Sequence, residues 1–328
     1  MTQKYTILSL LLLILCACSA ENQKELKQTP KKTKVKIEVP DFNADSAYYY
    51  IQKQVDFGPR VISSKPWENC AIWLEKKFLQ YTQYVMVQEA PTTTYDGKKH
   101  TIKNIIASFS PNKKNRVALF AHWDSRHIAD HDVENQNSPI LGANDGGSGV
   151  GVLIELARQF SFKEPKIGID IILFDAEDYG QPENSEFPYM PDSWCLGSQH
   201  WSKNPHKSHY TARYGILLDM VAGKDATFYL EGYSNYYASS ILQKVWKRGH
   251  KLGFGKHFVY ENSPQIIDDH LYVNTLAHIP TIDIIEFDPN TENKFNKHWH
   301  THGDDMNNID PETLKAVGQT LIEVLYRE

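Results

Sequence analysis

Three short polar motifs lie between residues 117 and 178, and the first and last of them directly follow apolar runs. Together they contribute an imidazole at His122 and carboxylates at Asp145, Glu177 and Asp178. Short β-rich runs on either side of a helical pattern predict parallel strands joined by a crossover helix. Ligands of such sheets bind at the carboxyl ends of the strands. We therefore expect these four side chains to converge at one edge of the sheet.

A metal ion is the simplest way to hold such groups together. Carboxylates and an imidazole in a partly desolvated site repel one another or shift their pKa values unless a cation lies among them. Oxygen and nitrogen donors without a thiolate suit catalytic zinc, where three protein ligands leave one position open. Taken alone, Asn144-Asp145-Gly146-Gly147 is typical of a turn with a helix cap, and Glu177-Asp178 of a solvated pair. Their order and their shared position at strand ends favour a metal site.

The rest of the chain supplies the elements that would position these groups. Apolar patterns predict strands at residues 85–87, 102–109, 117–120, 167–174, 214–221, 227–230 and 281–287. Helical periodicity and caps predict helices at residues 47–55, 67–81, 147–160, 193–200, 236–249 and 311–326. Residues 179–192 and 288–310 are predicted to be long loops, and loops of that length are often functional. The pattern predicts one α/β domain over residues 42–328, with an open, twisted, mostly parallel central sheet flanked by helices.

The first 41 residues have a different character. Lys4 precedes the apolar run Ile7–Leu15, which is too short to span a bilayer and is typical of a signal peptide. Leu15-Cys16-Ala17-Cys18 resembles a bacterial lipobox. That resemblance implies a lipoprotein signal peptide at residues 1–17 and lipidation of Cys18, whereas the alternative is an ordinary secretory signal cut near Ala20.

Residues 18–41 are rich in Lys, Gln and Glu and predict a flexible, lipid-anchored tether. The expected location is the bacterial cell envelope, with the protein anchored to a membrane and facing the periplasm. A formal net charge of −5 gives no support for nucleic-acid binding. Cys70 and Cys195 remain after processing, and an exported compartment permits a disulfide between them. Two unpaired buried thiols fit the sequence equally well, and the sequence predicts no particular oligomeric state.

Two further groups belong with the first motifs. Asp219 ends a predicted strand, and Trp299-His300-Thr301 lies in the second long loop. This loop offers three imidazoles, at His298, His300 and His302. Spacing alone does not select one, and alternating histidines in an exposed loop are also common as a chance surface cluster.

In this order, the motifs resemble those of the zinc-dependent glutaminyl-peptide cyclotransferases. The resemblance rests on His122-x-Asp124, Gly-Ala-Asn-Asp145, Glu177-Asp178, Asp219, Asp268-Asp269-His270 and Trp299-His300-Thr301, and it covers roughly residues 45–327. It implies a fold shared with the dinuclear zinc aminopeptidases. It also implies one zinc ion per chain, bound by Asp145, Asp178 and His300, with Glu177 as acid and base and with Asp219 and Asp268 as a hydrogen-bonded acidic pair. The implied reaction converts an N-terminal glutamine of peptides and exported proteins to pyroglutamate and releases ammonia.

An aminopeptidase that hydrolyses N-terminal residues is the alternative, because every position for two zinc ions has a donor. Those donors are His122, Asp145, Asp178, Asp219 and His300. Trp299 favours the cyclase, since the cyclases line their glutamine pocket with such a residue, and Trp194 is the candidate for a second aromatic wall. The run Ile267-Asp268-Asp269-His270 also favours the cyclase. Asp178 and Ile267 stand where vertebrate cyclases carry Glu and Gln, which resembles the bacterial branch and makes Ile267 a candidate substrate contact.

Overall fold

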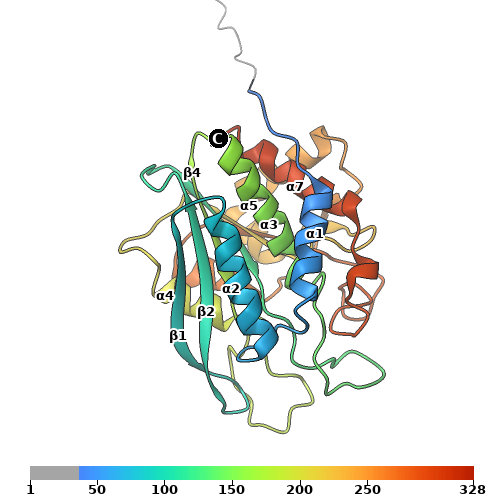
Figure 1. Ribbon diagram of the computed structural model, residues 1–328. Coiled ribbons are helices and arrows are strands. Elements are labelled where there is room, and N and C mark those ends of the chain that lie inside the picture. Colours follow the sequence, from blue (N-terminus) through green and yellow to red (C-terminus); the bar gives the residue numbers. More distant parts are fainter. Residues whose placement is uncertain (1–36) are drawn as a thin grey trace, which may run out of the picture. The chain divides into compact units, whose positions relative to one another are not determined.

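A six-stranded sheet forms the centre of the computed structural model, which describes residues 37–328 (Figure 1). Its strands are β1 (Val85–Thr93), β2 (Lys99–Phe109), β3 (Arg116–His122), β4 (Gly168–Phe174), β5 (Gly215–Asp219) and β8 (Thr281–Ile285). They lie in the order β1-β2-β4-β3-β5-β8. Strands β4, β3, β5 and β8 are parallel, and β1 and β2 extend the sheet in antiparallel fashion. The predicted α/β fold with a mostly parallel central sheet is confirmed.

Helices cover both faces of this sheet. They are α1 (Ala44–Val55), α2 (Lys65–Leu79), α3 (Gly147–Phe162), α4 (Leu196–Lys203), α5 (Gly232–Lys251), α6 (Asp269–Leu276) and α7 (Pro311–Leu325), with a short 3-10 helix at Met306–Asn308. On one face α1, α3 and α7 contact one another (Figure 1). Helices α4 and α6 contact each other and bury Trp201 and Val273 in a separate, smaller apolar cluster. The sheet is therefore covered on both sides, as expected for parallel strands.

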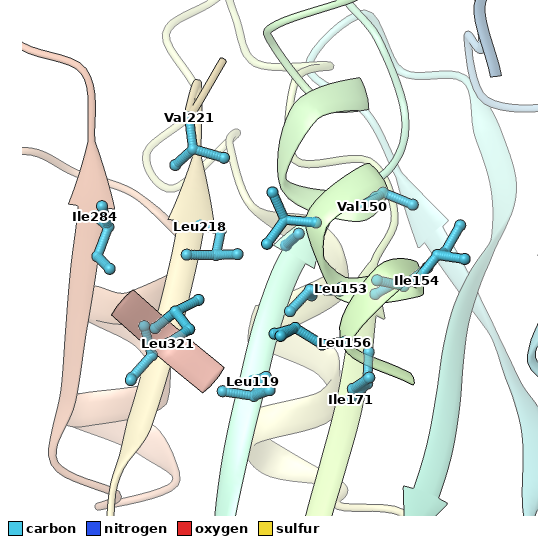
Figure 2. Close-up of a cluster of buried hydrophobic side chains, with 14 of the residues drawn as sticks. Leu119, Val150, Leu153, Ile154, Leu156, Ile171, Leu218, Val221, Ile284 and Leu321 are labelled. Carbon is cyan, nitrogen blue, oxygen red and sulfur yellow. The ribbon is translucent and has the colours of Figure 1, made fainter. Parts of the chain in front are cut away.

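Helix α3 packs between the sheet and α1, and its central residues are buried all around. Its side chains Leu153 and Leu156 lie over Leu119 and Leu218 of the sheet (Figure 2). Each fully buried leucine of this kind contributes about 1.5–3 kcal/mol to folding. At Gly149 a Cβ atom would lie 2.3 Å from the carbonyl oxygen of Leu218, so only glycine permits this close approach. The packing fixes the start of α3 beside the carboxyl ends of β3 and β5.

Most predicted elements are present, with their ends set by capping residues. Asn43 caps α1 by accepting a hydrogen bond from the Ser46 N–H at 2.8 Å, in place of the predicted cap at Asp45-Ser46. Asp310 caps α7 as predicted, with Pro311 in its first turn. Helix α4 begins at residue 196 instead of 193, because Cys195 adopts a left-handed conformation (φ 58°) that a helix cannot include.

Three elements were not predicted, namely α6, the strand β7 (Phe258–Asn262) and the short 3-10 helix within the predicted loop 288–310. The predicted edge strand at residues 227–230 is β6 (Phe228–Leu230), which pairs with β7 in a separate two-stranded sheet. Only Phe258 of β7 is buried, so the strand lacks an alternating apolar pattern. Asp268 caps α6 and Asp269 lies in its first turn. The acidic motif is therefore also the start of a helix, which was not predicted from the sequence.

Residues 37–328 form one compact unit. The carbonyl oxygens of Pro40 and Asp41 accept hydrogen bonds from Gln319 and Gln159, each at 3.2 Å. The last residues of the predicted tether thus contact the folded body. The predicted signal peptide, Cys18 and most of the tether lie outside the described residues.

The two remaining cysteines, Cys70 and Cys195, are both buried and unpaired. Of the two arrangements left open by the sequence, the structure has the free thiols. None of the helices in residues 37–328 is long and apolar enough to cross a bilayer.

Candidate metal centre and active site

Three of the predicted ligands meet at the carboxyl edge of the sheet. Asp145 directly precedes α3, Asp178 follows the end of β4, and His300 comes from the long loop after β8. The Nε2 atom of His300 lies 3.3 Å from Asp178 Oδ1 and 3.8 Å from Asp145 Oδ2. One donor atom from each residue lies within 4.8 Å of the others, and all three side chains are buried. This spacing suits a single ion.

The electrostatics of this cluster also fit a cation. Asp178 Oδ2 is buried and has no hydrogen-bond partner among the described residues. Burial, reinforced by the neighbouring Asp145 carboxylate, raises the pKa of Asp178 to about 6. A buried carboxylate oxygen without a partner is costly, and a metal ion supplies the missing charge. Two carboxylates and an imidazole are donors that zinc accepts.

A second layer of carboxylates holds the ligands in place. Asp304 accepts hydrogen bonds from the backbone N–H groups of Asn144 (2.7 Å) and Asp145 (3.0 Å). Asp124 accepts from the N–H groups of Glu177 and Asp178, both at 3.1 Å. Asp124 belongs to the first sequence motif, whereas sequence reasoning missed Asp304, which lies in an irregular loop without periodicity.

His300 has its own orienting partner, which the sequence also did not reveal. Its Nδ1 atom lies 3.1 Å from Asp130 Oδ1, while both oxygens of Asp130 accept hydrogen bonds from Arg126 (2.8 and 2.6 Å). Such a carboxylate fixes the ring and directs Nε2 toward the other ligands. His300 itself has a left-handed backbone (φ 56°), a conformation that is uncommon for non-glycine residues.

Geometry distinguishes among the three histidines of the loop. Only His300 belongs to a cluster of potential metal ligands in the described residues. His302 is exposed, and His298 lines a small neighbouring cavity with Asp145 and Asp304 without belonging to any ligand cluster of the described residues. The tertiary position of the loop therefore selects His300 as the ligand, which the spacing of the three histidines could not do.

A second potential ion site shares Asp145 with the first. His122 Nε2 lies 3.1 Å from Asp145 Oδ1 and 3.1 Å from Asp219 Oδ1, and the three residues form a second cluster of potential ligands. Burial raises the pKa of Asp219 to about 7, although the hydrogen bond with His122 opposes this shift. These are the predicted second-metal candidates, and the structure brings them together.

The expected hydrogen bond between Asp219 and Asp268 is not among those of the described residues. Asp219 pairs with His122, whereas Asp268 Oδ1 accepts a hydrogen bond from the Asp269 N–H at 2.5 Å. Asp268 nevertheless lies close enough to help raise the pKa of Asp219 by charge repulsion. His270, from the same motif, pairs with Glu231 at 3.0 Å and is absent from the Asp145 and Asp178 cluster.

Glu177 lies next to these groups without joining the Asp145, Asp178 and His300 cluster. Burial raises the pKa of its carboxyl well above the usual value, and the nearby Asp268 and Asp178 add to this, while His122 opposes it. Its Oε1 atom accepts a hydrogen bond from the Cys195 thiol at 3.2 Å. A carboxyl with a raised pKa beside a metal cluster is suited to proton transfer near neutral pH.

A cavity of about 200 Å³ opens onto these carboxylates. It is lined by Asp145, Glu177, Asp178, Trp194, Asp219, Met220, Ile266, Ile267, Asp268, Ile285, Phe295, Trp299 and His300. Trp299 stacks on His300 with ring centroids 3.7 Å apart, and Trp194 stacks on the same imidazole at 5.9 Å. The predicted contacts Trp194, Ile267 and Trp299 thus share one cavity with the catalytic candidates. Met220, Ile266, Ile285 and Phe295 were not predicted as lining residues.

Comparison with known proteins places this site in a family. The model of Peptidase family M28 matches residues 104–325. The chain belongs to this family. Its members include proteins with different names, so the family fixes the fold and the type of site before it fixes the reaction.

Individual relatives carry two kinds of name. A glutaminyl cyclase from Tannerella forsythia is 52% identical, with a TM-score of 0.86 over 88% of this chain and 100% of that one. A Zn-dependent exopeptidase from Parabacteroides distasonis is 53% identical, with a TM-score of 0.87 over 89% of this chain and 100% of that one. The glutaminyl-peptide cyclotransferase of Drosophila melanogaster is 26% identical over 239 residues, which are 65% of this chain and 61% of the fly protein. The family and the zinc-dependent neighbour support zinc as the ion of this site.

Proposed function

We propose that this protein is a glutaminyl-peptide cyclotransferase, which converts an N-terminal glutamine to pyroglutamate and releases ammonia. The observation that carries the proposal is the small cavity itself. It combines aromatic walls, at Trp194 and Trp299, with a carboxyl of raised pKa at Glu177 beside the metal cluster. A volume of about 200 Å³ suits one side chain. The names of the bacterial cyclases at about half sequence identity support the same activity.

The reaction requires the substrate to fold back on itself. Its α-amine nitrogen forms a bond to the side-chain amide carbon, and the bond from that carbon to the amide nitrogen breaks to release ammonia. Because the nucleophile and electrophile belong to one residue, the enzyme mainly has to hold the reactive conformer. We assign this task to Trp194, Ile267 and Trp299, which enclose the side chain and exclude water.

Proton transfer falls to Glu177. Its carboxylate takes a proton from the attacking amine and returns it to the leaving nitrogen, so no net proton is consumed by the enzyme. The thiol of Cys195 holds one carboxyl oxygen, which leaves the other available to the substrate. We assign Asp219 and Asp268, which line the same cavity, to the positioning of the amine.

We propose one zinc ion per chain, held by Asp145, Asp178 and His300. When bound there, zinc would supply Lewis-acid polarisation of the substrate's side-chain carbonyl. The resemblance of the motifs to those of the zinc-dependent cyclases supports a single ion.

An aminopeptidase is the second candidate function, and one observation favours it. The cluster of His122, Asp145 and Asp219 offers donors for a second ion next to the first. With two ions, Glu177 would activate water for hydrolysis of the N-terminal peptide bond. The exopeptidase name of the Parabacteroides protein is consistent with this reading.

Product analysis distinguishes the two functions. Purified, zinc-loaded protein is incubated with a Gln-initiated and a Leu-initiated peptide, and ammonia and free amino acids are measured. The cyclase releases ammonia from the first peptide and nothing from the second. Release of free leucine, together with two zinc ions per chain, would establish the peptidase instead.

We further propose that the mature protein is a lipoprotein anchored through Cys18 at the cell envelope and faces the periplasm. The support is the lipobox-like Leu15-Cys16-Ala17-Cys18 after an apolar run. Its substrates would then be peptides and exported proteins with an N-terminal glutamine. Replacement of Cys18 by Ser should abolish metabolic labelling with a fatty acid, and continued labelling would contradict the anchor.

A further inference from the structure

A second cavity, of about 390 Å³, opens directly beside the catalytic one. Trp194 and Ile267 line both cavities, so the two adjoin at these side chains. The remainder is formed mainly by the Pro-rich loop, residues 181–193, together with Tyr272 of α6. We call this second cavity the loop cleft. A ligand that fills the catalytic cavity and extends past Trp194 enters the loop cleft.

The loop is held in one shape by its own side chains. Gln181 donates from Nε2 to the carbonyl oxygens of Phe187 (3.1 Å) and Pro188 (3.2 Å), and its Oε1 accepts from Met190 N–H at 2.7 Å. The Tyr272 hydroxyl donates to Asp192 Oδ1 at 3.0 Å and ties the loop to α6. These bonds provide a preorganised wall, which lowers the entropic cost of binding.

The surface of the loop cleft is unusually apolar for an exposed segment. Phe187, Tyr189 and Ile267 line it and are 48%, 84% and 62% exposed. Exposed apolar side chains gathered at one place mark a binding surface. The only charged side chains in its lining are the acidic Glu183 and Asp192.

We propose, on the basis of the proposed function, that the loop cleft binds the side chain of the substrate's second residue, the one that follows the N-terminal glutamine. Cyclisation does not cut the peptide, so the rest of the substrate must leave the catalytic cavity over one of its walls. The Trp194 and Ile267 wall leads into apolar surroundings. An apolar or aromatic second residue is therefore preferred, and an acidic one is disfavoured by Glu183 and Asp192.

A third cavity, of about 770 Å³, adjoins the catalytic cavity at Trp299. Apart from Trp299, its lining residues are all polar, and they carry both signs of charge, from Glu183, Glu292 and Lys297. Such a surface offers little to an apolar side chain, since burial of apolar area is what stabilises that contact. The loop cleft is thus the assigned position.

The test compares Gln-Phe-Ala, Gln-Gly-Ala and Gln-Glu-Ala as substrates of the zinc-loaded full chain, with kcat/KM from ammonia release. We expect kcat/KM for the Phe peptide to exceed that for the Gly peptide by roughly tenfold, the lower range for a hydrophobic pocket. The Glu peptide should fall below the Gly peptide. In the double variant Phe187→Ser with Tyr189→Ser, the Phe-to-Gly ratio should fall to within about twofold of one, because most of the hydrophobic contact is lost.

Tyr236→Ser is the matched control, because Tyr236 is 76% exposed on α5 and does not line the loop cleft. It should keep the wild-type ratio. Equal kcat/KM for the three peptides, or an unchanged ratio in the double variant, overturns the inference. So does a change of the ratio in Lys297→Ala instead, which would assign the second residue to the third cavity. If the wild-type protein releases no ammonia from any of the peptides, the proposed function itself is refuted. That result differs from equal kcat/KM values, which would overturn only the inference about the loop cleft.

Discussion

Two aspartates associated with β4 have opposite environments. Asp170 lies within the strand and is fully buried, but it has an internal counter-charge: Arg116 donates two hydrogen bonds to it, at 2.5 and 2.8 Å. The Tyr210 hydroxyl adds a third bond at 2.8 Å. Burial alone would raise the pKa of Asp170, but Arg116 outweighs it and holds the pKa below its usual value.

Asp178, just beyond the other end of the strand, lacks such a partner. The nearest guanidinium is that of Arg126, which donates from Nε and Nη2 to Asp130. Only its Nη1 atom faces Asp178, at a long 3.5 Å from Oδ1, and the same Nη1 also donates to the Asp178 backbone carbonyl at 3.0 Å. The pKa of Asp178 is therefore raised, to about 6, by burial and by Asp145. At one end of the strand the carboxylate charge is compensated within the protein, whereas at the other end its compensation requires a bound cation. This difference identifies the metal centre more directly than the presence of acidic residues does.

Among the substitutions that test this difference, removal of a metal ligand should have the largest effect on zinc content and activity. We expect His300→Ala to lose zinc and to reduce cyclisation to the background rate, because the cluster then keeps only two of its three donors. His302→Ala, which changes an exposed imidazole of the same loop, should keep both properties. Metal analysis and ammonia release measure the two effects. If the His300 variant kept its full zinc content and the His302 variant lost zinc, His302 would be the ligand instead.

Glu177→Gln should separate chemistry from metal binding. Zinc content should stay at the wild-type level, while kcat falls by about 10²–10⁴, the usual contribution of a general acid and base. Glu134→Gln, at an exposed carboxylate, is the control for the same chemical change. Near wild-type turnover by the Glu177 variant would exclude it as the proton carrier.

Substitution of Asp170, whose charge Arg116 compensates, should affect stability instead of activity. Asp170→Asn leaves the Arg116 charge buried and uncompensated, which costs about 3–5 kcal/mol of unfolding free energy. Zinc content and kcat per folded molecule should not change. Denaturant unfolding gives the stability, and a loss of zinc in this variant would show that the two ends are coupled.

The sequence predicted the parts of the site that follow regular elements. Asp145, Glu177 and Asp178 could be located because α3, β3 and β4 have strong apolar patterns, and a parallel sheet brings its strand ends together. His300 could not be selected from the residues alone, since its loop has no periodicity and its position depends on tertiary contacts such as that with Asp130. The family resemblance, in contrast, depends on motif order and therefore reached His300 and Asp268 as well.

Asp130 should have a smaller effect than the ligands, because it acts through His300. In Asp130→Asn, zinc affinity should fall by about 10–100-fold, the usual cost of losing a carboxylate behind a metal-binding histidine. The kcat at saturating zinc should be retained, since the donors themselves are unchanged. Competition with a chelator measures the affinity. An affinity equal to that of the wild type would mean that the rigid loop alone orients the imidazole.

The metal-free protein should show the contrast between the two aspartates as opposite responses to pH. The raised pKa of Asp178, about 6 against an unfolded value of 3.8, means that its ionised form destabilises the metal-free fold above pH 6. This penalty disappears as the pH falls from 6 toward 3.8. The lowered pKa of Asp170 means that its stabilisation is fully present above 3.8 and is lost only as the pH falls through the folded value.

Unfolding free energies of the metal-free wild type and variants at pH 7 and pH 5 test the expected direction of the pH effect at each aspartate. At pH 7 the Asp178→Asn variant should be more stable than the wild type, because it removes a buried charge for which Arg126 and His300 do not fully compensate. At pH 5 this advantage should shrink. The deficit of Asp170→Asn should be the same at both values, since Asp170 stays ionised throughout that range. If both variants were destabilised equally and without pH dependence, Arg126 and His300 would compensate the Asp178 charge fully, and the argument for a cation at this end of the strand would fail.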